Sequence, residues 1–183
     1  MDSANESDRF ASVVEPHLTD ALTLARWLTG NAADAEDVVQ EACLRAFRGI
    51  GNFNGGSARA WVLTIVRNTT FSWIAKHRRF KLVAFDDLSN DERESLELGM
   101  GTDSGVIATP EEELIARTDS EGLHAAIAKL SEEYREVLVL RDVQGLDYRE
   151  IAMVTGSPLG TVMSRLARAR QRLIREIAAP QGK

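Results

Sequence analysis

Five polar side chains near the carboxyl end of the chain have the types and spacing needed to read DNA. They are Thr161, Ser164, Arg165, Arg168 and Arg172. On an α-helix these positions fall along one stripe, and no acidic residue interrupts it. Arginine can bind guanine edges bidentately, and hydroxyls or further arginines can hold phosphates. The stripe predicts a helix that enters the major groove. The plainer alternative is a solvated face of a helical bundle.

The residues before this stripe predict the element that would present it. Asp147 and Glu150 have the spacing of a reciprocal helix cap and open a short helix. Gly156 interrupts that helix, after which Ser157 is expected to cap a new helix and Pro158 to occupy its first position. Two helices joined by a short glycine-containing turn are typical of a helix-turn-helix.

The first half of the chain holds a second basic cluster, and this one is mixed with aromatic residues. The basic residues are Arg67, Lys76, Arg78, Arg79 and Lys81, and the aromatic ones are Phe53, Trp61, Phe71, Trp73 and Phe80. This mixture suits single-stranded nucleic acid, because stacking contributes about 1 to 3 kcal/mol per base while cations follow the backbone. Asn68 and Ser72, one helical turn apart, add hydrogen-bonding groups.

The aromatic residues of this cluster also have a structural interpretation. Trp61 and Trp73 fall on an apolar stripe, which favours core packing for both. Phe53 lies in a loop flanked by glycines, so core packing and base stacking both stay open for it.

A third candidate surface is the acidic start of a helix. Asp34, Glu36, Asp37 and Glu41 lie in its first turns, where the helix dipole favours negative charge. Such a face is usually solvated, and a partner-binding role is the alternative.

The periodicity of apolar residues predicts an all-α fold, since no run alternates apolar and polar residues as a strand would. One helix is expected over 34–50 and another from about Ser57 to Phe80. A further helix should start at Thr109, where Pro110 and Glu112 complete the capping signature. Ser131 is expected to cap a helix that stops at Gly145.

The charge distribution predicts two modules and a linker. The 183 residues carry a formal net charge of -6, but residues 1–85 sum to +1, residues 86–122 to -10 and residues 123–183 to +3. Glycine and serine are interspersed with acids between 86 and 108. We therefore expect domains over 1–85 and 109–183, joined by a flexible acidic linker over 86–108.

Composition argues against several other classes of protein. The sequence has no apolar run long enough to span a membrane, and its polar, acidic beginning does not resemble a signal peptide, so a cytoplasmic protein is expected. The single cysteine, Cys43, excludes an internal disulfide. His17, His77 and His124 are too widely spaced to suggest a metal site. No catalytic spacing or phosphate-binding glycine loop is present, so no enzyme activity and no cofactor are expected.

Three ordered segments resemble the extracytoplasmic-function (ECF) group of bacterial sigma factors, which contain regions 2 and 4. They are residues 30–41, residues 60–69, and residues 145–152 followed by 160–170. In that family the first docks on the clamp helices of the large RNA polymerase subunit. The second opens the promoter, and the third reads the minus-thirty-five element. The resemblance covers nearly the whole chain and implies a transcription initiation factor.

The resemblance implies roles for residues at matching positions. Those implied to contact core polymerase are Asp34, Asp37, Gln40 and Glu41. Those implied to contact the minus-ten element are Phe53, Asn54, Ser57, Arg67, Asn68, Ser72, Lys76, Arg78 and Arg79. The minus-thirty-five reader would be the stripe of Thr161, Ser164, Arg165, Arg168 and Arg172. Met163 and His77 depart from the family pattern, which leaves the exact promoter sequence open.

The family also implies partners. These are core RNA polymerase, through its clamp-bearing subunit and its flap, promoter DNA and an inhibitory anti-sigma factor. The acidic linker would either pass through the basic RNA channel or act as a solvated tether. The rival function is a free-standing helix-turn-helix regulator that binds operator DNA as a dimer. A regulator should bind a palindrome unaided, whereas a sigma factor gains specificity with core polymerase.

Overall fold

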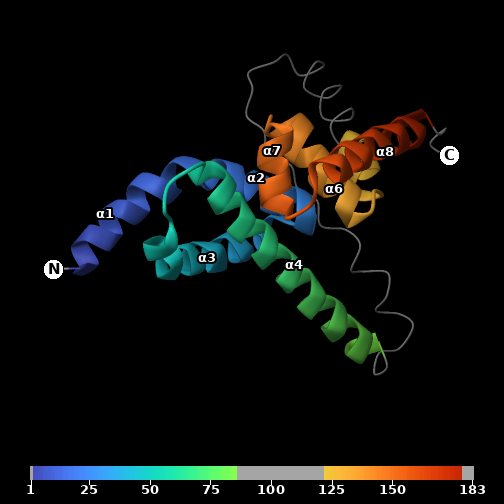
Figure 1. Ribbon diagram of the computed structural model, residues 1–183. Helices are drawn as coiled ribbons and strands as arrows, with labels where there is room; N and C mark the ends of the chain where they lie inside the picture. The colour runs from blue at the N-terminus through green and yellow to red at the C-terminus, as the bar shows by residue number, and fades with distance from the viewer. Residues whose placement is uncertain (1, 86–121, 179–183) are drawn as a thin grey trace, which may run out of the picture. The chain divides into compact units, whose positions relative to one another are not determined.

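The computed structural model describes residues 2–85 and 122–178, with side chains over 6–78 and 122–178 (Figure 1). Within those ranges every regular element is helical, which confirms the all-α prediction. The described helices fall in two compact units, with α1 to α4 in the first and residues 122–152 and 156–178 in the second. The predicted linker over 86–108 and the predicted cap at Thr109 lie outside the described residues.

The first unit consists of four α-helices and two short 3-10 turns. The elements are α1 (Asp2–Val14), η1 (Glu15–His17), α2 (Leu18–Thr29), α3 (Ala32–Gly49), η2 (Ile50–Asn52) and α4 (Ala58–Phe85). Gly30, with φ of 73°, ends α2 in the left-handed conformation that glycine adopts at low cost. Asn31 then caps α3, because its side chain accepts a hydrogen bond from the N–H of Asp34 at 3.1 Å.

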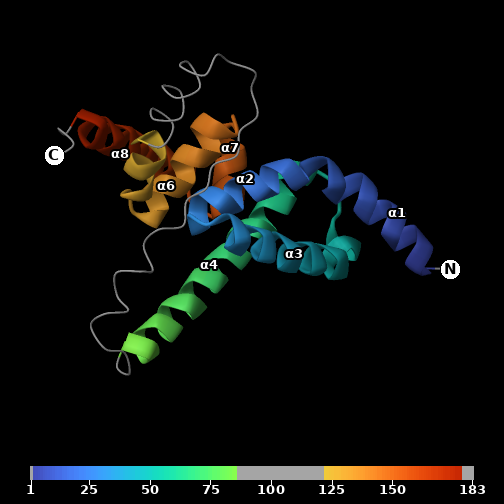
Figure 2. The same cartoon turned by 180° about the vertical axis from the view of Figure 1, so that it is seen from behind.

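The core of this unit lies where α2, α3 and α4 pack together. On α4, Val62, Val66 and Thr69 are buried, whereas Trp61 and Trp73, for which core packing was predicted, are only half-buried. The helix runs to Phe85, five residues past the expected end. Its second half projects beyond α2 and α3, and both views show this (Figures 1 and 2).

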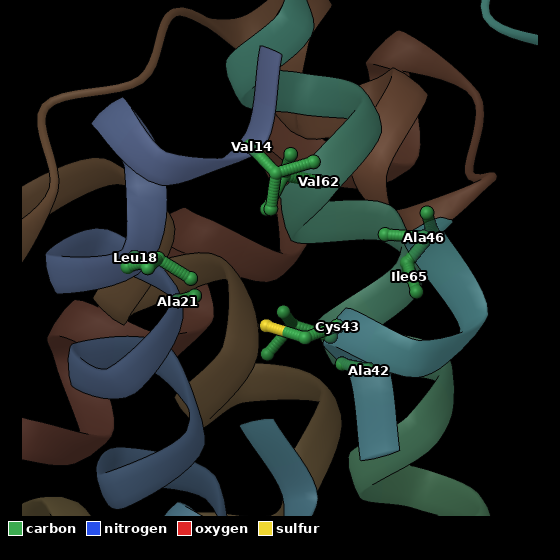
Figure 3. Close-up of a pocket in the computed structure, with 9 residues that line it drawn as sticks. Val14, Leu18, Ala21, Ala42, Cys43, Ala46, Val62 and Ile65 are labelled. Carbon is green, nitrogen blue, oxygen red and sulfur yellow. The ribbon is translucent and has the colours of Figure 1, made fainter. Parts of the chain in front are cut away.

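A small apolar cavity of about 10 Å³ lies inside this core (Figure 3). Cys43 points into it from α3, opposite Leu18 and Ala21 of α2 and beside Val62 of α4. Burial raises the pKa of the Cys43 thiol. Cys43 is therefore a structural residue of this core, and the neutral thiol is the form that its surroundings favour.

The second unit begins with helical residues 122–128 and continues through four more elements. They are α6 (Glu132–Leu138), the π-helical turn η4 (Val139–Val143), α7 (Tyr148–Thr155) and α8 (Leu159–Ala178). Ser131 precedes α6 as predicted, but its hydroxyl makes no capping bond, and its carbonyl accepts the N–H groups of Tyr134 and Arg135 instead. Arg135 also donates to the carbonyls of Ile127 and Leu130 and so closes the preceding helix.

The helix-turn-helix forms as predicted, with one correction at its turn. Asp147 and Glu150 make the reciprocal capping box, and Gly156, with φ of 63°, ends α7. The second helix starts at Leu159, so Pro158 precedes it and does not open it. The carbonyl of Pro158 accepts the N–H groups of Thr161 and Val162. The hydroxyl of Ser157 accepts a hydrogen bond from Arg165 at 3.1 Å, and its role as the cap of α8 stays a prediction.

Candidate nucleic-acid interface

Helix α8 has one face buried in its unit and one face open to solvent. Val162, Leu166 and Ala169 form the buried face. An exposed face follows a regular helical spacing through Gly160, Met163, Ser164, Ala167, Arg168 and Gln171. Ser164 and Arg168 of the predicted stripe belong to it, Arg172 is also exposed, and Thr161 and Arg165 are half-buried.

The other members of the predicted stripe lie on the flank of α8 that meets α6. Arg165 is 25% exposed at its side chain, and its Nη2 atom lies 3.1 Å from a carboxylate oxygen of Glu133. The guanidinium of Arg172 lies over the ring of Tyr134, 4.6 Å from the centroid, and the residue is still exposed. Thr161 is half-buried. The predicted stripe itself contains no acidic residue, but Glu133 of α6 supplies a carboxylate from outside it.

Two further arginines of α8 differ in how they are held. Arg170 donates from Nε to Asp142 at 3.0 Å, and this hydrogen bond raises the pKa of Arg170 above its usual value. Arg168 is exposed and makes no ion pair within the described residues. Arg168 is therefore the arginine of the predicted set that is most available to a phosphate or a base.

In the first unit, the loop between η2 and α4 holds three of the predicted residues. Gly55 and Gly56 have φ of 97° and 88°, so the chain turns sharply and leaves Asn54 exposed. The Phe53 ring is half-buried and lies 5.2 Å from the Trp61 ring, tilted by 46°. Ser57 caps α4, because its hydroxyl accepts the N–H of Ala60 at 3.2 Å.

An arginine outside the predicted set also holds this loop. The guanidinium of Arg9, on α1, donates a hydrogen bond to the carbonyl of Phe53. Phe10 follows on α1, and its ring meets that of Phe47 edge-on at 5.5 Å. No sequence pattern pointed to Arg9, since a contact across 44 residues leaves no periodic signal.

The predicted residues of α4 share an exposed side of the helix. Asn68 and Ser72 are exposed, and the Ser72 hydroxyl donates to the Asn68 carbonyl at 2.8 Å. Arg67 donates to the Asn68 Oδ1 atom at 3.1 Å and stacks over the Phe71 ring at 4.6 Å. The amide nitrogen of Asn68 therefore keeps its donors for a ligand.

The basic cluster continues along the projecting half of α4. Lys76 and Arg78 are exposed, and Arg79 follows on the same helix. The Trp73 ring is half-buried and stacks on His77 with centroids 3.6 Å apart. Neither Trp61 nor Trp73 is fully buried, so the core interpretation holds only in part.

The candidate polymerase-binding residues lie on α3. Asp37 and Gln40 are exposed, whereas Asp34 and Glu41 are half-buried. Arg45 donates to Glu41 at 2.8 Å, and this hydrogen bond is the main cause of the lowered pKa of Glu41.

Two exposed apolar side chains on α3 were not among the residues predicted from the sequence. Leu44 is 53% exposed and Phe47 is 40% exposed. Leu44 lies one turn after Gln40 and off the buried stripe, which is the signal that could have identified it.

The described residues contain no group of three or more His, Cys, Asp or Glu that could hold a metal ion. Over the same ranges, none of the helices has the length and hydropathy required to cross a bilayer.

Two protein families match the chain, one in its first half and one in its second half. Residues 13–80 match sigma-70 region 2 and residues 120–173 match sigma-70, region 4. The first range covers α2, α3 and most of α4, and the second covers the helix-turn-helix.

Curated relatives are similar over most of the chain. The RNA polymerase sigma-H factor of Pseudomonas aeruginosa is 36% identical over 77% of this chain and 72% of its own length. The ECF RNA polymerase sigma-E factor of Haemophilus influenzae is 32% identical over 84% and 79%. The ECF RNA polymerase sigma factor SigE of Mycolicibacterium smegmatis is 33% identical over 88% of this chain, which spans 58% of that relative.

Solved structures share the fold. The sigma factor RpoE of Bartonella quintana, crystallised with the anti-sigma factor NepR, has a TM-score of 0.73 at 24% identity. The match covers 94% of this chain and 98% of that one. CnrH, in complex with the cytosolic domain of CnrY, has a TM-score of 0.61 at 24% identity over 94% and 89%. With regions 2 and 4 in one chain and these relatives, the protein belongs to the ECF RNA polymerase sigma factors, which are transcription initiation factors and not enzymes.

Proposed function

We propose that this chain directs core RNA polymerase to promoters by two different contacts with DNA. The second unit reads the double-stranded minus-thirty-five element, and the first unit captures an unpaired base of the minus-ten element. The observation that carries the proposal is the exposed face of α8, which a capped helix-turn-helix holds clear of its own core. Such a face has the dimensions and chemistry for the major groove.

In the second unit, Ser164 and Arg168 are the proposed direct contacts. Both are exposed on the first turns of α8, which are the turns that a recognition helix places against base edges. The contacts from Arg165 and Arg172 to α6 support a positioning role for these two, with phosphate contact at their outer edges. Thr161 lies at the same flank and is proposed to contact the backbone.

In the first unit, the proposed base pocket is the loop of Phe53, Asn54 and Ser57. Extruding a base from the duplex costs a few kcal/mol, and a site that binds only the extruded base recovers that energy. Binding the melted state better than the duplex shifts the equilibrium toward open promoter, so no nucleotide hydrolysis is required. Asn68 and Ser72 are proposed to line the same strand, with phosphates held by the basic residues Arg67, Lys76, Arg78 and Arg79.

We propose that core polymerase binds the α3 face. Asp37, Gln40 and Glu41 supply polar contacts there. Leu44, which is exposed to solvent in the free chain, adds an apolar contact. Asp34, half-buried in the first turn, is proposed to contribute at the edge of this face. A mixed face with an apolar centre is typical of a reversible protein interface.

An anti-sigma factor is a further proposed partner, since the sigma factor RpoE, which shares this fold, was crystallised with the anti-sigma factor NepR. We also propose that the chain acts in the cytoplasm, where DNA and polymerase are found.

The acidic linker over 86–108 stays a prediction, and so does its passage through the RNA channel. The test is to neutralise Glu92, Glu94 and Glu97 and to measure the affinity for core polymerase. Unchanged polymerase affinity at low and high salt would count against the channel.

The central experiment is reconstitution with core RNA polymerase and a promoter library, with run-off transcription as the readout. We expect initiation at defined start sites. Asn68→Ala should impair promoter opening more than duplex binding, whereas Arg168→Ala should weaken binding of the upstream element. Gln171→Ala, on the same exposed face but one turn beyond Arg168, is the matched control. Failure to join core enzyme, or initiation without preference for any site, would contradict the proposal.

A further inference from the structure

An apolar patch lies on the exposed face of α8. Met163 is 50% exposed, and Ala167, one turn further along, is also exposed. Leu159, one turn before Met163, is 44% exposed. Large apolar side chains grouped on a soluble surface generally mark a contact with a partner.

The charged and polar neighbours of this patch indicate which partner fits. Ser164 adjoins Met163, and Arg168 adjoins Ala167. Arg168 has no acidic partner within the described part of the chain, so the patch borders an uncompensated positive charge. A surface that pairs an apolar centre with a free cation matches the major groove, where a thymine presents a methyl group between phosphate-lined walls.

We infer that Met163 is a specificity-determining residue that contacts the C5-methyl group of a thymine in the upstream promoter element. The inference rests on the proposal that α8 enters the major groove. Met163 lies within the first two turns of α8, and these turns approach base edges in a docked recognition helix. The thioether side chain is long, unbranched and polarizable, so it can follow a methyl group without a fixed geometry.

The test removes the methyl group and nothing else. Holoenzyme reconstituted with the full chain first selects its upstream element from a random duplex library. Each thymine of that element is then replaced by uracil, and the affinity of wild-type holoenzyme is measured. Burying one methyl group contributes about fourfold in affinity, so we expect about a fourfold loss at one thymine.

Variants at position 163 complete a double-mutant cycle with the methyl group. Met163→Gln should bind the thymine and uracil duplexes equally, whereas Met163→Leu should keep the preference for thymine. Ile174→Ala is the control, because Ile174 is 66% exposed on the same side of α8 but three turns further on. It should keep the full discrimination of the wild type.

Several outcomes would overturn the inference. One is that Met163→Gln keeps the wild-type preference for thymine, and another is that no thymine of the element responds to replacement by uracil. An equal loss with both duplexes, accompanied by weaker assembly with core polymerase, would show that Met163 serves a protein contact instead. Absence of any selected upstream element would overturn the groove proposal as well, and this distinguishes its failure from a failure of Met163 alone.

Discussion

The Glu133 carboxylate on α6 lies 3.1 Å from Nη2 of Arg165 on α8, and the same guanidinium donates to the Ser157 hydroxyl at 3.1 Å. One side chain therefore links the supporting helix, the turn and the recognition helix. With its side chain 25% exposed, Arg165 is held in the unit and is not fully available to DNA. Its expected role shifts from direct reading to positioning.

This linkage predicts that two neighbouring arginines act differently. Arg165→Ala should lower the stability of α8 by about 0.5–1 kcal/mol, the range for a partly exposed ion pair with an added hydrogen bond. Hydrogen exchange of the α8 amides would measure that change. Arg168→Ala should leave α8 exchange unchanged and should weaken upstream-element binding, with the salt slope reduced by about one. Equal effects of the two variants on exchange would contradict the assignment.

The contact between Arg9 and the Phe53 carbonyl predicts an effect on promoter opening. Arg9→Ala removes the guanidinium that holds the Phe53 loop, so the loop becomes more flexible. Binding of the extruded base must then also order this loop, which weakens the binding. A hydrogen bond of about 1 kcal/mol corresponds to about a fivefold loss of open complex. Permanganate reactivity of unpaired thymines would measure it.

Ser12→Ala provides the matched control for Arg9, because Ser12 donates only to the Arg9 carbonyl within α1. It should open promoters as the wild type does. Binding of the upstream duplex should not change in either variant, and a loss of that binding in Arg9→Ala would point to general unfolding.

The capping box predicts a local cost at the start of α7. The Asp147 side chain accepts the N–H groups of Arg149 and Glu150, each at 2.8 Å, and Glu150 returns a bond to the Asp147 N–H at 3.0 Å. Asp147→Ala should therefore cost about 1 kcal/mol, as cap removal usually does. Faster amide exchange in α7 is the expected readout. Arg149→Ala, whose exposed side chain takes no part in the cap, should leave that exchange unchanged.

Cys43 predicts a dependence of stability on alkaline pH. Burial raises its pKa in the folded chain, so the folded state holds the thiol proton to higher pH than the unfolded state does. Stability from this group is complete below the ordinary thiol pKa and is lost as pH rises through the raised value. The urea midpoint of unfolding should therefore fall more between neutral and alkaline pH in the wild type than in Cys43→Ala. An identical fall of the urea midpoint in the wild type and in Cys43→Ala would contradict this prediction.

Much of the secondary structure follows from the sequence because its signals are local. The Asp147–Glu150 pair predicted the capping box, and the glycine after α7 predicted the turn. The helix over 34–50 was expected within two residues of the observed Ala32–Gly49. Cap chemistry and apolar periodicity act within a few residues, so they can be read along the chain. The domain limits of 1–85 and 109–183 stay predictions.

The direction in which each face points was decided by tertiary contacts. Spacing placed Thr161, Arg165 and Arg172 with Arg168 on one stripe, but Arg165 and Arg172 contact side chains of α6, whereas Met163 and Ala167 are exposed. Arg9 and Leu44 likewise acquired candidate roles only once α1 and α3 were placed. Helical periodicity tells which residues share a side of one helix. Only the neighbouring helices determine which part of that side is covered, because burial depends on contacts between residues far apart in the chain.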